Sequence, residues 1–243
     1  MNKGAIKLKK TIGILGGISL ASTIQYYKKI TDLYYERYND YYYPEIRINS
    51  LDFQYFTDLE NEHRTEEYIN YIVKGIHALE KSGAEFVIMG ANSPHSVFNE
   101  VLNKINVPMI SIVESTAKRA TELKLSKVLL TGIKYTMQAT FYQEVFKKYN
   151  IEVITPNEAH QDEINSIIFN ELVINIFADK TRKRMLDIVQ SYHVEGVILG
   201  CTELPLLITQ NICPIPVLDT LSLHAKAALD FSLNEEYKSL SFT

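Results

Sequence analysis

Apolar runs of strand length alternate with longer stretches of helical periodicity along most of the chain. Eight runs are short and apolar on both faces, as strands covered by helices on both sides are; they lie at 11–16, 45–51, 85–90, 107–110, 127–131, 151–154, 196–200 and 215–218. Helical patterns lie near 20–39, 65–82, 94–104, 112–124, 137–149, 160–176, 178–192 and 220–232. This alternation predicts an α/β fold with a mainly parallel sheet.

An internal repeat divides this pattern into two halves. The segment Phe86–Ser93 aligns with Gly196–Glu203, and Val107–Ile110 aligns with Ile215–Leu218 at nearly the same offset. We therefore expect two similar lobes, each a mainly parallel sheet flanked by helices. The first lobe is expected to contain residues 1–112 plus 214–243, and the second residues 113–213.

The composition argues against two classes of protein, nucleic-acid binders and membrane-spanning proteins. The 25 basic and 29 acidic residues give a net charge of −4, so no basic face could supply the phosphate contacts of a nucleic-acid binder. No run approaches the roughly 20 apolar residues that a membrane helix needs, and the first ten residues lack a secretory apolar core. Only two cysteines, Cys201 and Cys213, are present, which favours a reducing cytoplasm. Cys213, next to Pro214, is interpreted as structural.

Candidate chemistry gathers where the expected strands end, which is where parallel α/β sheets bind ligands. Small or polar residues follow four of them, at 16–19, 91–95, 131–136 and 200–203. Cys201 precedes an expected helix start, whose positive end should favour a thiolate. The glycines at 13, 16 and 17 do not have dinucleotide spacing and suit close approach to a carboxylate better. No cluster has metal-ligand spacing, so we expect no metal and no other cofactor.

The same motifs resemble the aspartate/glutamate racemase family. The likeness rests on the opening IGILGGISLASTIQYYKKI, on Asn92-Ser93-Pro94-His95, on Thr131 with Thr136, and above all on Gly200-Cys201-Thr202-Glu203. It runs from about residue 10 to 232. The resemblance implies a two-lobed, dimeric α/β enzyme that needs no pyridoxal phosphate and has its active site in the cleft between the lobes. It further implies two acid/base residues, one per lobe, on opposite sides of the substrate α-carbon.

One position departs from that family. The residue before the Asn-Ser pair is usually cysteine, sometimes threonine, and here it is Ala91, which the internal repeat places opposite Cys201. A methyl group cannot transfer a proton, so Ala91 marks the position of a missing second base, for which Ser93, His95 or a water are stand-ins. The resemblance thus predicts a racemase of aspartate, glutamate or a similar small amino acid that uses Cys201 as its catalytic residue.

Two alternatives stay open. The chain could be a one-cysteine decarboxylase or isomerase of a small dicarboxylate, since arylmalonate decarboxylase, a relative, keeps only the later cysteine. It could also be a catalytically weakened homologue that only binds its ligand.

The expected substrate-binding residues are Gly17, Ile18, Gln54, Asn92, Ser93, Thr131, Thr136, Thr202 and Glu203. Backbone N–H groups near Gly17 and Ser93, with Asn92 and Thr136, would hold the α-carboxylate, and Thr202 with Glu203 would hold the amino group. Taken singly, such side chains are more often turn or cap residues. A second substrate carboxylate would need a cation, for which Arg47, Arg64 and Lys134 are candidates.

Eight tyrosines fall within residues 26–43. Tyrosine-rich helical faces are most often core or subunit contacts. We therefore expect this stretch to form the interface of a homodimer. The expected ligand is a small amino acid or carboxylic acid.

Overall fold

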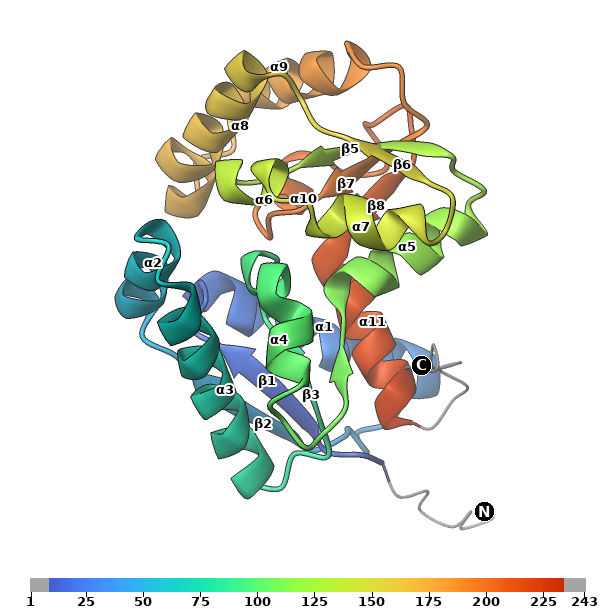
Figure 1. Ribbon diagram of the computed structural model, residues 1–243. Helices are drawn as coiled ribbons and strands as arrows, with labels where there is room; N and C mark the ends of the chain where they lie inside the picture. Colours follow the sequence, from blue (N-terminus) through green and yellow to red (C-terminus); the bar gives the residue numbers. More distant parts are fainter. Residues whose placement is uncertain (1–8, 234–243) are drawn as a thin grey trace. The chain divides into compact units, whose positions relative to one another are not determined.

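The computed structural model describes residues 9–233 and contains two four-stranded parallel sheets (Figure 1). The first sheet has the order β2-β1-β3-β4, with β1 Ile12–Gly16, β2 Ile46–Ser50, β3 Phe86–Met89 and β4 Met109–Ile110. The second has the order β6-β5-β7-β8, with β5 Lys127–Thr131, β6 Glu152–Ile154, β7 Gly196–Leu199 and β8 Val217–Asp219. Equivalent strands follow the same order in both sheets, which confirms the expected α/β fold of two similar lobes.

The helices largely match the sequence pattern. They are α1 Leu20–Tyr38, α2 Phe53–Asn61, α3 Thr65–Lys81, α4 Phe98–Leu102, α5 Ile112–Glu122, α6 Lys134–Gln138, α7 Phe141–Lys147, α8 Glu158–Asn170, α9 Asp179–Gln190, α10 Leu204–Leu207 and α11 Thr220–Ser232, with 3₁₀ turns η1 Ser93–Val97 and η2 Leu172–Ile174. The helix expected at 137–149 is divided into α6 and α7 because Ala139 between them is extended. Helix α2 was not expected, and α10 is the short helix whose start was expected after Cys201.

The chain forms two compact units that the expected boundaries only partly describe. Of the described residues, the first unit contains 9–90, Val97–Ser111 and 224–233, and the second contains Ala91–Ser96 and Ile112–Leu223. The structure thus differs from the expectation that residue 214 starts the return to the first lobe. The reason is that β8 pairs in parallel with β7, with Val217 beside Val197.

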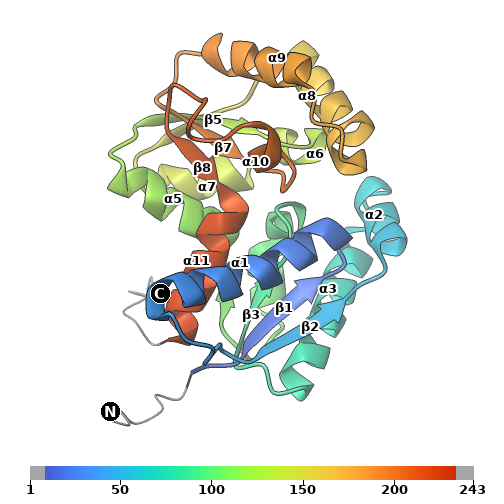
Figure 2. The same ribbon diagram turned by 180° about the vertical axis from the view of Figure 1, so that it is seen from behind.

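In the second unit the sheet is covered on both faces (Figures 1 and 2). Leu199 of β7 packs with Ile164 of α8 and Ile188 of α9 in one apolar cluster. The preceding residue, Ile198, packs in a second apolar cluster with residues of α5 and α7. This alternation follows from the two-residue period of a strand, and it explains why both faces of β7 are apolar. Cys213 is buried in the first of these clusters, as expected for a structural cysteine.

In the first unit, α1 covers one face of the sheet and α3 the other (Figures 1 and 2). Helix α3 approaches β1 closely at Gly75, where a Cβ would lie 2.5 Å from Cδ1 of Leu15. Ser19 caps the N-terminus of α1, and its side chain accepts a hydrogen bond from the Ser22 N–H. Among residues 9–233, no helix is both long enough and apolar enough to cross a membrane.

Candidate active site

Cys201 lies just beyond β7 and is bonded to a carboxylate. Its thiol donates a hydrogen bond to Oε2 of Glu203 over 3.0 Å, and Oγ1 of Thr202 donates to the same oxygen over 2.8 Å. Thr202 and Glu203 are buried, and Cys201 is partly exposed. The structure therefore brings together the three residues of the most specific sequence motif.

This environment keeps the Cys201 side chain in its thiol form. Burial around the sulfur raises the pKa of Cys201 well above its usual value, and the carboxylate of Glu203 raises it further. Helix α10 begins three residues later, at Leu204, and is only four residues long. The expectation that a helix start would favour a resting thiolate is therefore not met, because desolvation and the adjacent negative charge act in the opposite direction.

The ends of β5 and β7 meet closely beside Cys201. The Gly200 N–H donates to the Thr131 carbonyl over 2.7 Å, and a Cβ on Gly200 would lie 2.7 Å from that oxygen. The same Cβ would be 3.5 Å from Cγ2 of Thr136. Thr136 is thus adjacent to the residue before the cysteine, at a point where only glycine fits.

Thr136 and Thr131 have different roles in this arrangement. The Thr136 side chain is fully buried, and its Oγ1 has no hydrogen-bond partner among the described residues. An unpaired buried hydroxyl costs about 1–3 kcal/mol, so Thr136 is well suited to bind a ligand atom. Thr131, in contrast, donates its only hydroxyl hydrogen to the Ile198 carbonyl over 2.8 Å, so it cannot also donate to a substrate carboxylate.

Asn92 is buried, and both its amide oxygen and its amide nitrogen already form hydrogen bonds within the protein. Nδ2 donates to Oγ1 of Thr220 over 3.1 Å, and Oδ1 accepts from the hydroxyl of Tyr142 over 2.6 Å. One N–H of the amide remains for a ligand. Ser93 is also buried, at the start of η1.

His95 is committed to the backbone on both sides of its ring. Nε2 accepts from the Ile112 N–H over 3.1 Å, so Nδ1 must carry the proton, which it donates to the Ala91 carbonyl over 3.0 Å. His95 thus holds the peptide of Ala91 in place. Because both nitrogens are engaged, this geometry does not support His95 as a replacement for the missing base.

Three of the nine expected substrate-binding residues belong to the first unit, and the other six belong to the second. Gly17 has a φ of 79°, and its N–H, which we expected near the substrate carboxylate, donates to Oγ1 of Thr23 over 2.9 Å. Gln54 is exposed on α2 and donates to Asp58 over 2.7 Å. Ile18 is buried. A role in substrate binding for these three residues stays a prediction.

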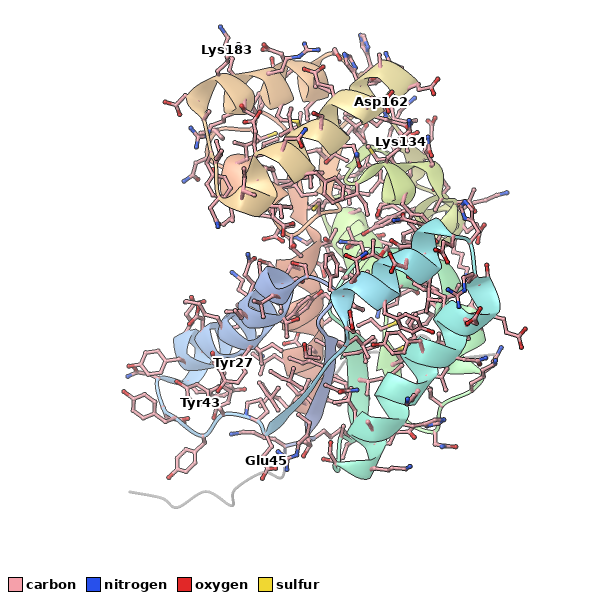
Figure 3. All side chains as sticks on the ribbon, turned by 90° about the vertical axis from the view of Figure 1, so that its left-hand side faces the viewer. Tyr27, Tyr43, Glu45, Lys134, Asp162 and Lys183 are labelled. Carbon is pink, nitrogen blue, oxygen red and sulfur yellow. The ribbon has the colours of Figure 1, made fainter. Side chains whose placement is uncertain are left out.

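The three candidate cations are each paired with a carboxylate. Arg47 contacts Glu45 at 2.6 Å, and Lys134 contacts Asp162 at 2.5 Å (Figure 3). Arg64 binds Glu67 through two nitrogens and also contacts Glu62. All three are partly exposed. None of them is held as an unpaired cation for a second substrate carboxylate.

Sequence reasoning missed Tyr142 and Thr220, the two residues that fix Asn92. Thr220 directly follows β8, so the rule applied to four other strand ends would have identified it. Tyr142 carried no such signal, because a buried tyrosine in a helix is usually a core residue. Its contact with Asn92 depends on tertiary structure.

Comparison with known proteins relates the chain to racemases. The model of the family described as Asp/Glu/hydantoin racemase matches residues 15–228. A broad-specificity amino-acid racemase, RacX, from Bacillus subtilis (strain 168) is 29% identical over 227 residues, covering 90% of this chain and 96% of that protein. The crystal structure of an aspartate racemase homologue from Pyrococcus horikoshii OT3 superposes with a TM-score of 0.83 at 37% identity, covering 92% of this chain and 99% of that one. The aspartate racemase of Picrophilus torridus shares the fold, with a TM-score of 0.73 at 24% identity over 93% and 94% of the two chains.

Proposed function

Because the chain belongs to the Asp/Glu/hydantoin racemase family, we propose that it transfers the α-proton of a small amino acid with Cys201 as the acid/base residue. Membership makes the protein an amino-acid racemase, an isomerase of a family that works without pyridoxal phosphate.

The observation that carries this proposal is the hydrogen bond between the Cys201 thiol and the Glu203 carboxylate. In the forward step, Oε2 of Glu203 takes the thiol proton and the thiolate then takes the proton from the α-carbon. Burial raises the pKa of Cys201, so the thiolate, once formed, is a stronger base than an exposed one. A stronger base is better matched to a weakly acidic C–H bond.

The negative charge that develops on the substrate needs hydrogen-bond donors at its α-carboxylate. The unpartnered hydroxyl of Thr136 and the remaining amide N–H of Asn92 are the best candidates in the second unit. Such preorganised donors in a desolvated site stabilise the transition state, and removal of one typically costs about 10²–10³ in rate. Ser93 and Thr202 are further proposed contacts.

The methyl group of Ala91 leaves the opposite face of the α-carbon without a strong proton donor. We propose that the wild type exchanges the α-proton of one enantiomer faster than it inverts the centre. The same observation supports a second candidate function, a one-cysteine decarboxylase or isomerase of a small dicarboxylate, in which a single face is protonated. A homologue that only binds its ligand would show neither reaction.

The pairing of the three candidate cations decides which amino acids should be compared as substrates. With Arg47, Arg64 and Lys134 each paired, the substrates to be compared are aspartate and glutamate against small amino acids with uncharged side chains. The two thiols are free, which supports a cytoplasmic location.

The decisive experiment follows the α-proton signal by NMR in D2O for both enantiomers of each amino acid. Cys201→Ala should abolish exchange, and the matched Cys213→Ala should leave it nearly intact. Ala91→Cys should raise inversion, by up to the ~10²-fold low end expected for one acid/base group. Activity should survive dialysis against EDTA. Full activity in Cys201→Ala would overturn the proposal, and equal rates of exchange and inversion in the wild type would show that another group already serves the second face.

A further inference from the structure

Asn92 is part of a chain of three hydrogen bonds that ends on the backbone of β7. The Tyr142 hydroxyl bonds Oδ1 of Asn92 over 2.6 Å, Nδ2 of Asn92 bonds Oγ1 of Thr220 over 3.1 Å, and Oγ1 of Thr220 bonds the Leu199 carbonyl over 2.9 Å. All of these residues belong to the second unit. We call this set the Asn92 hydrogen-bond chain.

The direction of every bond in the Asn92 hydrogen-bond chain is fixed by the groups present. The hydroxyl of Thr220 has one hydrogen, and the Leu199 carbonyl can only accept it, so Thr220 must accept from Nδ2 of Asn92. Oδ1 of the amide therefore faces Tyr142, which must donate. Burial raises the pKa of Tyr142 above its ordinary value, so it stays a phenol and keeps its donor.

The Asn92 hydrogen-bond chain joins the segment that contains Ala91 to the segment that leads to Cys201. Asn92 directly follows Ala91, and Leu199 lies two residues before Cys201. Tyr142, Asn92 and Thr220 are almost completely buried, and buried polar groups that satisfy one another resist reorientation. The amide of Asn92 is therefore held in one orientation, and one of its two N–H groups takes no part in the Asn92 hydrogen-bond chain.

We propose that Tyr142 and Thr220 are positioning residues that aim this remaining N–H of Asn92 at the carboxylate of the substrate. The proposal rests on the function proposed above, since it assigns a purpose to the same site. Neither residue touches the substrate; both act through Asn92. Displacement of a donor by about 1 Å can cost as much as 10²-fold in rate. The hydrogen bonds that orient the amide of Asn92 therefore contribute to the rate of the reaction.

The test is a double-mutant cycle on the kinetics of α-proton exchange. Tyr142→Phe and Thr220→Val should each raise KM about tenfold, the equivalent of one lost hydrogen bond, and should also lower kcat, because the same N–H stabilises the charge that develops in the transition state. In an Asn92→Ala background, Tyr142→Phe should raise KM no further, because the group it orients is gone. Thr220→Ser keeps the hydroxyl and should restore the wild-type KM.

A matched control separates positioning from stability. Tyr192 is in the same unit and its hydroxyl bonds His160 and the Asn157 N–H, each at 2.8 Å. Tyr192→Phe should lower Tm and leave KM unchanged. If Tyr142→Phe and Thr220→Val behave like this control, or if Tyr142→Phe raises KM equally without Asn92, the positioning role is overturned.

Failure of the proposed catalytic function can be distinguished from failure of the positioning role. A wild type without any exchange would contradict the catalytic proposal, and the same cycle would then be measured by calorimetry as the Kd of aspartate, glutamate and alanine. A tenfold weaker Kd in Tyr142→Phe for the amino acid that binds, absent in the Asn92→Ala background, would support the positioning role alone. Absence of binding of all three amino acids by the wild type would overturn both.

Discussion

At Cys201 the two main influences on the thiol act in the same direction. Burial raises the pKa of Cys201, and the carboxylate of Glu203 raises it further by repelling the thiolate. Glu203 is also the acceptor of the thiol proton. The carboxylate of Glu203 therefore makes the thiolate harder to form at equilibrium, and in the reaction proposed above it is also the group that removes the thiol proton.

Glu203→Gln separates these two effects. Loss of the charge should lower the pKa of Cys201, so alkylation of Cys201 by iodoacetamide should rise at a lower pH than in the wild type. Loss of the proton acceptor should at the same time reduce α-proton exchange by about 10²–10⁴. The pH profile of alkylation, followed by mass spectrometry, and the exchange rate check the two arms. A variant in which both rates move in the same direction would contradict the role of Glu203.

At the scale of elements, the sequence predicted the strands better than the helices. Strands β1 to β8 were all expected, because each lies in a short run rich in apolar residues, although β2 alternates apolar with polar positions and is only partly buried. Helix α2 was missed because it follows β2 after only two residues, and its start depends on Asp52, which accepts from the Tyr55 N–H. The sequence predicted a candidate site from residues that are neighbours in the chain, Cys201, Thr202 and Glu203, and the structure shows that their side chains are hydrogen-bonded to one another; their role in catalysis and binding stays a prediction. The site could not be predicted where a side chain is satisfied by a distant one, as with Asn92 and Tyr142.

The contact between α1 and α11 should make stability depend on pH. His224 of α11 is fully buried, contacts the Tyr26 hydroxyl at 2.8 Å and bonds the Ile110 carbonyl at 2.9 Å. Burial lowers the pKa of His224 to about 4, against about 6.5 in the unfolded chain. Between these values the unfolded chain binds a proton that the folded chain does not, so the free energy of unfolding should fall as the pH decreases through this window, by roughly 3 kcal/mol at most.

Urea unfolding at about pH 7.5 and about pH 4.5 measures this effect against other titrating groups. In His224→Gln the part of the pH dependence due to the imidazole should vanish. The same loss of stability on acidification in both proteins would show that His224 does not contribute.

At the scale of the whole molecule, an apolar surface remains on α1 and the loop after it. Leu20, Ile24 and Tyr27 repeat at helical spacing and are 72%, 58% and 51% exposed. Tyr41, Tyr42 and Tyr43, in the loop after α1, are exposed as well, and Figure 3 shows Tyr27 and Tyr43 at the outside of the first unit. Exposed large apolar side chains gathered on one element often mark an interaction site. Two tyrosines of α1, Tyr26 and Tyr34, are instead buried in the core.

We predict that this surface forms a homodimer. Light scattering at micromolar concentration should give a mass near twice the 27.9 kDa of the chain. Ile24→Lys combined with Tyr27→Lys should produce the monomer, whereas Ile176→Lys, at an equally exposed apolar position of the second unit, should not. A wild-type protein with the monomer mass would refute the prediction.

The discontinuity of the first unit has a consequence for the order in which the protein can be assembled during synthesis. The sheet of the second unit is complete once β8 has been made, and its residues from Ile112 to Leu223 are contiguous. The first unit must wait for α11, because Tyr26 of α1 finds His224 almost two hundred residues later. On the ribosome the first unit, whose strands are made earlier, is therefore the one that is completed last, because it still lacks α11 when the second sheet is finished.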